Sequence, residues 1–289
     1  MTTLGFLGLG KMGGPMAARL AAAGHGLVVY DKAGTSERAP AGARVAQSIA
    51  GVAAEAETVF LSLPDGAAVK DATREIIDAL RRRTTTVVDL STIGIAAAQA
   101  AAAEMAAAGL DYLDAPVSGG VTGAVKGTLA VMASGKRETF ERLKPALGAI
   151  AKNLFHVGEK PGQGQAMKLL NNFLSATAMA ATSEATIFGE SHGLDMATML
   201  AVLNVSTGQN TATSDKFVNR VLTGSFDAGF TTRLMAKDVG LYLENVEAAG
   251  THAEVGRVVT GIMARLASAL PDADFTRIYQ FLGGTRHSR

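Results

Sequence analysis

The sequence predicts an α/β fold with a doubly wound, mainly parallel sheet, followed by an all-α region that is joined to it through one long helix. Over residues 3–160, short apolar runs alternate with helix-like segments, which is typical of a parallel sheet with helices on both faces. Past Gly164 the strand-like runs end. Gln165–Gly189 contains no Pro and no internal Gly, so it can form one helix about 40 Å long.

The apolar runs of the first region are short, rich in β-branched residues and bounded by turn residues, as strands are. The predicted strands are Thr3–Leu7, Leu27–Tyr30, Thr58–Leu63, Thr86–Leu90, Asp111–Asp114, Leu129–Ala133 and Leu154–Val157. The longer segments between them have the apolar spacing of helices. The predicted helices of this region are Met12–Ala23, Ala67–Leu80, Ile95–Ala108 and Arg137–Ile150.

The second region is expected to be entirely helical, because its apolar residues recur at helical spacing. After the long helix, the predicted helices are Asp195–Asn204, Thr213–Leu222, Leu234–Ala249, Val255–Ala269 and Ala273–Leu282. The turn-rich segment Glu159–Gly164 separates the two regions. We therefore expect a first domain over residues 1–161 and a second, all-helical domain over residues 162–289.

The composition is that of a globular protein of about two domains, with 289 residues, 48% hydrophobic and 18% charged. A net charge of +1 argues against a dedicated nucleic-acid binder or a membrane-surface protein. The absence of Cys excludes disulfides, a thiolate nucleophile and Cys-ligated metals. The five His residues are scattered, so no metal site is expected. The N-terminus from Met1 lacks a basic leader and no apolar stretch of about 20 residues exists, so we expect a cytoplasmic protein.

Glycine is unusually frequent, with 33 residues or about 11% against a typical ~7%. One cluster, Gly8-Leu9-Gly10-Lys11-Met12-Gly13, follows an apolar strand and opens a helix. In that context G-x-G-x-x-G is the dinucleotide-binding fingerprint of Rossmann domains, although a bare match also arises by chance. We expect Gly8 to form the tight turn, Gly10 to admit a pyrophosphate and Gly13 to let the helix lie close to the strand.

Asp31 directly follows the second predicted strand, 18 residues after Gly13. A carboxylate at this place accepts hydrogen bonds from the adenosine ribose hydroxyls and repels a 2′-phosphate. The sequence therefore favours NAD as the cofactor. Lys32 and Arg38 lie nearby and leave NADP possible.

Two further segments carry candidate substrate-binding groups. Ser118, Gly119 and Gly120 follow a predicted strand, where a hydroxyl and free backbone N–H groups can hold a carboxylate, or where the chain makes an ordinary turn. Lys168 and Asn172 lie four residues apart near the start of the long helix and share one helix face. They can hold a substrate hydroxyl and exchange its proton, provided that the lysine pKa, about 10.4 in water, is lowered. The alternative is a surface lysine near a helix start.

Taken together, these motifs resemble the β-hydroxyacid dehydrogenase family over nearly the whole chain. The resemblance rests on Gly8–Gly13 with Met16-Ala17, Leu63-Pro64, Asp89–Thr92, Asp114–Gly120, Lys168–Asn172 and Lys237-Asp238. It implies that Lys168 is the catalytic acid/base, that Asn172 binds the substrate hydroxyl, and that Ser118, Gly119 and Gly120 hold the substrate carboxylate. With the glycine motif, it implies cofactor contacts from Gly8, Leu9, Gly10, Met12, Gly13, Asp31, Leu63, Pro64, Thr92 and Lys237.

The implied activity is hydride transfer between NAD and the hydroxyl-bearing carbon of a small β-hydroxy acid. Segments such as Val202–Gly208 are most similar to 3-hydroxyisobutyrate dehydrogenases, which oxidise 3-hydroxyisobutyrate to methylmalonate semialdehyde. Gln209 stands where that subgroup usually has Arg, so tartronate semialdehyde or another hydroxy acid remains an alternative substrate. A cofactor-binding protein without turnover is a further alternative. Apolar helix faces in the second domain, like the resemblance, favour a homodimer or homotetramer.

Overall fold

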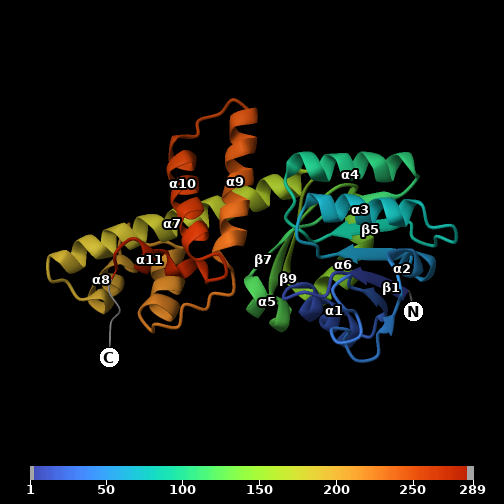
Figure 1. The fold of residues 1–289 in the computed structure, drawn as a ribbon, viewed down its shortest axis with the longest axis horizontal. Coiled ribbons are helices and arrows are strands. Elements are labelled where there is room, and N and C mark those ends of the chain that lie inside the picture. The colour runs from blue at the N-terminus through green and yellow to red at the C-terminus, as the bar shows by residue number, and fades with distance from the viewer. Residues whose placement is uncertain (1–2, 285–289) are drawn as a thin grey trace. The chain divides into compact units, whose positions relative to one another are not determined.

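The computed structural model describes residues 3–284, which fall into two compact units, 3–168 and 169–284 (Figure 1). Met1 and His287, which entered the expectations about a leader and a metal site, lie outside the described residues. The units meet within one helix, after Lys168, whereas the sequence placed the domain boundary after Pro161. Among the described residues, no helix is long and apolar enough to cross a membrane.

The first unit is built around one twisted sheet, and the predicted α/β fold is confirmed. Its strands are β1 Thr3–Leu7, β2 Gly26–Tyr30, β3 Arg44–Val45, β4 Thr58–Leu61, β5 Thr86–Asp89, β6 Asp111–Asp114, β7 Val117–Ser118, β8 Leu129–Ser134 and β9 Ala151–Gly158. They are ordered β3-β2-β1-β4-β5-β6-β8-β7, with β9 beside β8. Pairing is parallel from β3 to β6, whereas β8 runs antiparallel to β6 and β7.

Helices cover both faces of this sheet, as α3 and α4 on one side and α1, α5 and α6 on the other show in Figure 1. Their bounds are α1 Gly13–Ala22, α2 Ile49–Glu55, α3 Gly66–Ile77, α4 Ile95–Ala107, α5 Gly120–Lys126 and α6 Arg137–Ile150. One buried cluster joins the sheet to α1, α5 and α6, around Phe6, Met16 and Leu147. A second joins it to α2, α3 and α4, around Leu61, Ile76 and Met105. Central strands are therefore apolar on both faces, which explains their continuous hydrophobic runs.

Four short elements of this unit escaped prediction: β3, α2, β7 and α5. The two strands are two residues long and the two helices seven, which is too short for a hydrophobic period to develop. Local chemistry marks α2 better than periodicity does. The Ser48 hydroxyl caps it by accepting a hydrogen bond from Gly51 N at 3.1 Å.

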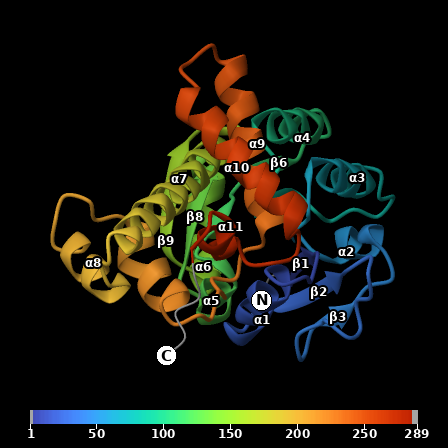
Figure 2. The same cartoon turned by 60° about the vertical axis from the view of Figure 1, so that its left-hand side comes forward.

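The second unit is helical, as predicted, and packs around the later turns of α7 (Gln163–Ser191). The other elements are α8 Met196–Leu203, η1 Ala212–Val221, α9 Thr232–Ala248, α10 Glu254–Ala269, η2 Phe275–Arg277 and α11 Ile278–Phe281. Figure 2 shows α9 and α10 side by side, as their contacts require. Their common core contains Met179, Phe217, Met263 and Tyr279, all fully buried or nearly so.

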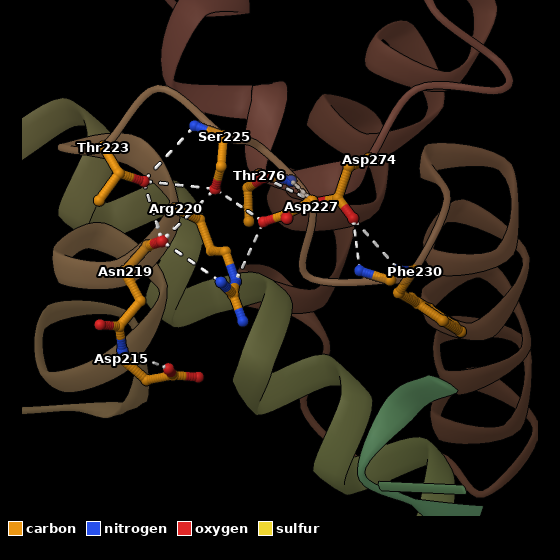
Figure 3. A network of polar contacts seen from close by, with 10 residues as sticks. Asp215, Asn219, Arg220, Thr223, Ser225, Asp227, Phe230, Asp274 and Thr276 are labelled. Carbon is orange, nitrogen blue, oxygen red and sulfur yellow. Dashed lines mark hydrogen bonds and ion pairs between the residues drawn. The ribbon is translucent and has the colours of Figure 1, made fainter. Parts of the chain in front are cut away.

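Polar side chains fasten the segment between η1 and α9 (Figure 3). Arg220 Nε lies 3.3 Å from the Asp227 carboxylate, which also accepts a 2.7 Å hydrogen bond from Ser225 Oγ. Asp274 Oδ2 accepts hydrogen bonds from the backbone N–H groups of Gly229 and Phe230 at 2.8 and 3.2 Å. A single carboxylate thus ties the start of α9 to the segment before η2.

Two predicted helices of this unit lie at the expected residues but are not regular α-helices. The predicted helix Thr213–Leu222 is the π-helix η1, and the predicted helix Ala273–Leu282 divides into the 3₁₀ turn η2 and the short α11. The Asp274 side chain caps η2 by accepting from Thr276 N at 3.0 Å. Because this cap begins the helix after Asp274, the residues before it are not helical but form a turn, in which Ala273 N donates to Leu270 O.

Candidate active site

Apart from Lys237, which lies in α9, the predicted cofactor-binding residues follow the carboxyl ends of neighbouring parallel strands. From β1 the chain builds the sheet outward through β2 and β3, and then crosses to the other side through β4 and β5. The strand order therefore reverses between β1 and β4, and ligands of open α/β sheets bind at such a reversal. The turns after β1, β2, β4 and β5 all open on this edge.

The glycine turn after β1 has the geometry that the sequence predicted. Gly8 has φ +89°, and a Cβ there would overlap the carbonyl oxygen of Ser62. A Cβ on Gly13 would overlap the carbonyl oxygen of Gly8, so α1 can lie this close to the turn only with glycine. A Cβ on Gly10 would meet nothing within 4 Å, and no side chain caps the start of α1 at Met12. The turn therefore presents open space and uncapped helical N–H groups, which fits a pyrophosphate.

Asp31, at the end of β2, is bound to this turn. Its Oδ2 accepts a 2.6 Å hydrogen bond from Leu9 N, and its Oδ1 accepts a 2.7 Å hydrogen bond from Ala33 N. Arg38 Nη1 lies 3.4 Å from both carboxylate oxygens, with its own side chain 42% exposed. The carboxylate expected to bind the ribose thus lies beside an exposed guanidinium. The carboxylate suits the ribose hydroxyls of NAD and the guanidinium suits the 2′-phosphate of NADP, so the site is compatible with both cofactors.

The loops after β4 and β5, which contain Leu63, Pro64 and Thr92, are joined by Ser91. Ser91 Oγ accepts a 2.9 Å hydrogen bond from Leu63 N, and Ser91 N donates to Asp89 Oδ1 at 2.9 Å. Asp89 is fully buried, and burial raises its pKa to about 6 despite hydrogen bonds from Ser91 and the Tyr112 hydroxyl. These contacts hold the two predicted cofactor loops in one arrangement.

The second glycine cluster lies beyond the carboxyl end of β6. The pairs Asp114↔Ser134, Val117↔Val131 and Ser118↔Ala130 keep one register, so β7 extends the line of β6 along β8. Ser118 ends β7, and Gly119 and Gly120 have φ +128° and +62° and begin α5. The segment is therefore a strand-to-helix junction and not an ordinary turn, and it is partly exposed at Ser118.

Lys168 belongs to the first unit and lies in the second turn of α7. Its side chain is only 7% exposed, so the structure excludes the alternative of a surface lysine. Buried lysines are rare and are retained where their amine interacts with other groups. The first turn of α7 is anchored by Gln165 and Asp114, both fully buried, through hydrogen bonds described below.

In the second unit, Asp238 brings together two predicted site residues. Asn172 Nδ2 donates a 2.5 Å hydrogen bond to Asp238 Oδ2, and Lys237 Nζ lies 3.3 Å from Asp238 Oδ1. Phe173 and Tyr242 stack with ring centroids 4.1 Å apart, one residue and one turn further along the same two helices. Helices α7 and α9 therefore fix Asn172 and Lys237 through one buried carboxylate, Asp238, which is 1% exposed.

The chain resembles proteins of known activity over its whole length. Residues 3–158 match the model of the NAD-binding domain of 6-phosphogluconate dehydrogenase. Residues 162–282 match the model described as NAD-binding of NADP-dependent 3-hydroxyisobutyrate dehydrogenase. A 3-hydroxyisobutyrate dehydrogenase of Pseudomonas aeruginosa is 38% identical, with 98% of this chain and 99% of that protein covered. The chain belongs to the 3-hydroxyisobutyrate dehydrogenase family.

Further relatives of this dehydrogenase agree. A probable 3-hydroxyisobutyrate dehydrogenase of Mycobacterium tuberculosis is 36% identical over 98% of both chains. The solved structure of the M. tuberculosis enzyme with L-serine has a TM-score of 0.90 at 35% identity, covering 98% of this chain and 100% of that one. The dehydrogenase is thus an NAD(P)-dependent oxidoreductase with a Rossmann-type first unit, and both sequence expectations are confirmed.

Three residues of the dehydrogenase that organise the site received no role from the sequence: Asp114, Gln165 and Asp238. Each is a polar residue that is at most 1% exposed. Asp114 and Asp238 belong to two of the motifs that carry the family resemblance, Asp114–Gly120 and Lys237-Asp238. Gln165 lies three positions before Lys168 on the same helix. An acid at the end of a buried strand is the signal that could have identified Asp114, because such a group requires partners. Among the described residues, no group of three or more His, Asp or Glu side chains is placed to hold a metal ion.

Proposed function

We propose that this dehydrogenase oxidises 3-hydroxyisobutyrate to methylmalonate semialdehyde, reversibly, with NAD as the hydride acceptor. The observation that carries the proposal is the burial of Lys168 in the second turn of α7, in a chain whose full-length relatives are named 3-hydroxyisobutyrate dehydrogenase. A buried amine beside the site can take the hydroxyl proton without competition from bulk water.

The site residues have three functions: proton transfer, binding of the substrate carboxylate and orientation of the substrate hydroxyl. The Lys168 amine accepts the proton of the substrate hydroxyl during oxidation and returns it during reduction. Ser118 Oγ and the N–H groups of Gly119 and Gly120 bind the substrate carboxylate, while the Asn172 amide orients the hydroxyl. When bound, the nicotinamide cofactor supplies the hydride acceptor. Orientation of the reacting carbon then accounts for much of the rate.

The cofactor residues are those of the glycine turn and the loops on the same edge of the sheet. Gly8, Leu9, Gly10, Met12 and Gly13 bind the pyrophosphate. The other cofactor contacts are Asp31 at the ribose, Leu63, Pro64 and Thr92 in the two loops, and Lys237 near the nicotinamide. The open face of Gly10 and the uncapped start of α1 support the pyrophosphate contacts, and the hydrogen bond from Leu9 N to Asp31 supports the placing of Asp31 beside them. The hydrogen bond from Leu63 N to Ser91 Oγ supports the two loops as one binding surface.

A second substrate is favoured by two comparisons. A 2-(hydroxymethyl)glutarate dehydrogenase of Eubacterium barkeri is 35% identical over 83% of this chain, and the similar M. tuberculosis structure holds L-serine. Gln209 also replaces a residue that the subgroup usually has as Arg. These observations support a different small hydroxy acid, tartronate semialdehyde among them, as the alternative within the same chemistry.

A substrate panel tests the proposal. The purified protein is assayed for NADH formation with 3-hydroxyisobutyrate, L-serine and 2-(hydroxymethyl)glutarate, and for NADH consumption with tartronate semialdehyde. We expect the highest kcat/KM with 3-hydroxyisobutyrate. A higher kcat/KM with another acid would show that this acid, and not 3-hydroxyisobutyrate, is the substrate. NADH binding without turnover on the whole panel would refute catalysis.

We further propose a cytoplasmic homodimer or homotetramer. Exposed apolar side chains on the helical unit, such as Leu174, Phe188 and Val205, support a second copy as their cover, because monomers rarely expose many large apolar groups together. Size-exclusion chromatography with light scattering gives the mass directly, and a monomer at micromolar concentration would contradict it.

A further inference from the structure

A buried polar network lies under the first turn of α7, at the carboxyl edge of the sheet. It joins Asp114 at the end of β6, Ser134 at the end of β8, Ser91 in the loop after β5 and Gln165 in α7. All four side chains are at most 5% exposed. Buried polar groups are costly unless they are fully hydrogen-bonded, so such a network restricts the local structure strongly.

The Gln165 amide uses every hydrogen-bonding position that it has. Its Oε1 accepts from Ile93 N at 2.8 Å and from Gly94 N at 3.1 Å. Its Nε2 donates to Ser91 O at 3.0 Å and to Asp114 Oδ1 at 2.6 Å. The flipped amide would set its oxygen against two acceptors and its NH₂ against two donors, so only one orientation is possible.

Asp114 accepts four hydrogen bonds. Besides the Gln165 side chain, its Oδ2 accepts from Ser134 Oγ at 3.0 Å and from the backbone N–H groups of Gly162 and Gln165 at 3.2 and 3.1 Å. Ser134 Oγ accepts in turn from Gly164 N at 3.0 Å, so its own proton points to Asp114. Burial raises the pKa of Asp114, while these donors favour the charged carboxylate.

Three of the donors to Asp114 and Ser134 are backbone N–H groups that the start of a helix leaves without an intrahelical partner. Asp114 and Ser134 therefore cap α7 from the sheet through three of its first N–H groups, those of Gly162, Gly164 and Gln165. The same Gln165 binds the loop 91–94, which includes the predicted cofactor residue Thr92. One side chain thus joins the cofactor loop to the turn that precedes Lys168.

We propose that Asp114 and Gln165 are positioning residues, which hold the first turn of α7 against the loop 91–94 and so place the Lys168 amine for proton transfer. Positions three apart on a helix are neighbours, so a shift of Gln165 moves the backbone of Lys168 with it. A misplacement of about 1 Å is enough to lower a rate by about 10²-fold. This inference rests on the proposed role of Lys168.

Gln165→Glu tests the proposal with a residue of the same shape. It removes both donated hydrogen bonds and sets a second carboxylate against Asp114. In the protein without cofactor, we expect hydrogen exchange of the amides at 162–168 to accelerate at least about tenfold. With cofactor, we expect kcat to fall about 10- to 100-fold while KM for the hydroxy acid changes less than about threefold.

Thr84→Val is the matched control. The buried Thr84 hydroxyl donates to Ala53 O and Ala56 O at the amino end of β5, away from α7. We expect this variant to lose stability but to keep kcat and the exchange rates at 162–168. If it lowers kcat as much as Gln165→Glu does, general destabilisation explains both variants and the proposal is wrong.

A reciprocal exchange adds a rescue. In the double variant Asp114→Asn with Gln165→Glu, the new amide donates to the new carboxylate, which still accepts from Ile93 N and Gly94 N. Only the bond to Ser91 O is lost, so we expect kcat at least about fivefold above that of Gln165→Glu alone. A double variant as slow as the single one would contradict the pairing.

Lys168→Ala distinguishes the proposed role of Lys168 in proton transfer from the proposed positioning role of Asp114 and Gln165. If it keeps normal turnover, the role of Lys168 is wrong, whatever the exchange data show. If it abolishes turnover while Gln165→Glu keeps both normal kcat and normal exchange, the positioning inference alone is overturned. Should Gln165→Glu fail to fold, Ser134→Ala removes the acceptor of Gly164 N more gently, and faster exchange at that amide is then the expected result.

Discussion

We expect Asp89 to make this protein less stable as the pH rises, and its replacement by Asn to remove the effect. The side chain is fully buried under the loops after β4 and β5, and burial raises its pKa from 3.8 to about 6. In Asp89→Asn, the amide oxygen still accepts from Ser91 N, and the amide N–H can donate to the Tyr112 oxygen. The neutral side chain therefore fits the same place with no charge to bury.

The size of the effect follows from the shift in pKa. Below about pH 4, Asp89 is protonated in both the folded and the unfolded chain, and contributes no penalty. Between about pH 4 and pH 6, the unfolded chain ionises first, so the folded state loses stability as the pH rises. Above about pH 6 the loss is complete, and two pKa units correspond to roughly 3 kcal/mol.

Urea unfolding at a series of pH values, followed by circular dichroism, measures this difference. The free energy of unfolding of Asp89→Asn minus that of the wild type is expected to increase by roughly 3 kcal/mol from pH 4 to pH 7. Asp111→Asn is a control of opposite sign. Although partial burial opposes it, hydrogen bonds from Lys136 and Thr139 lower the pKa of Asp111, so its stabilisation is lost as the pH falls. A difference for Asp89→Asn that stays constant with pH would refute the reasoning.

Three further predictions concern the site. Lys168→Ala should lower kcat by about 10²- to 10⁴-fold with little change in NADH affinity, measured by NADH fluorescence, and unchanged turnover would remove it as the acid/base. Gly10→Ala should keep the thermal midpoint, because its Cβ meets no protein atom, but should weaken NADH binding, because that Cβ occupies the space proposed for the pyrophosphate. Gly13→Ala should lower the midpoint, because its Cβ would overlap the carbonyl oxygen of Gly8. Equal midpoints for the two variants would contradict this. Asp31→Asn should raise kcat/KM with NADP relative to NAD, and adding Arg38→Ala should reverse that gain; a wild type that prefers NADP would contradict the assignment.

Much of the first unit could be predicted because its strands are buried on both faces and its turns carry specific chemistry. The run Leu27–Tyr30 is apolar throughout, and it forms β2 with Asp31 directly after it. The glycine turn was predictable residue by residue, because only backbone geometry and close approach are involved. The two-residue strands β3 and β7 were not predictable, since their pairing depends on neighbours that are distant in sequence.

The support of the site was harder to predict than its motifs. Gln165 is a polar residue in a long helix, and nothing local distinguishes it from a solvent-exposed glutamine. Its partners come from 51 to 74 positions earlier in the chain, and only folding brings them together. Asp238 was likewise visible only as part of a motif, because its contact with Asn172 spans 66 residues.

The π-winding of η1 has a consequence for how its sequence can change. Its buried residues are Ala212, Thr213, Phe217 and Val221, and winding by hydrogen bonds from i to i+5 brings all four onto one face, whereas a regular α-helix would turn Ala212 away from Val221. Residues of this segment are therefore restricted as a set: a one-residue deletion would regularise the winding but turn the aromatic ring away from Tyr279. Substitutions that conserve hydrophobicity can be accepted here, whereas changes of length cannot.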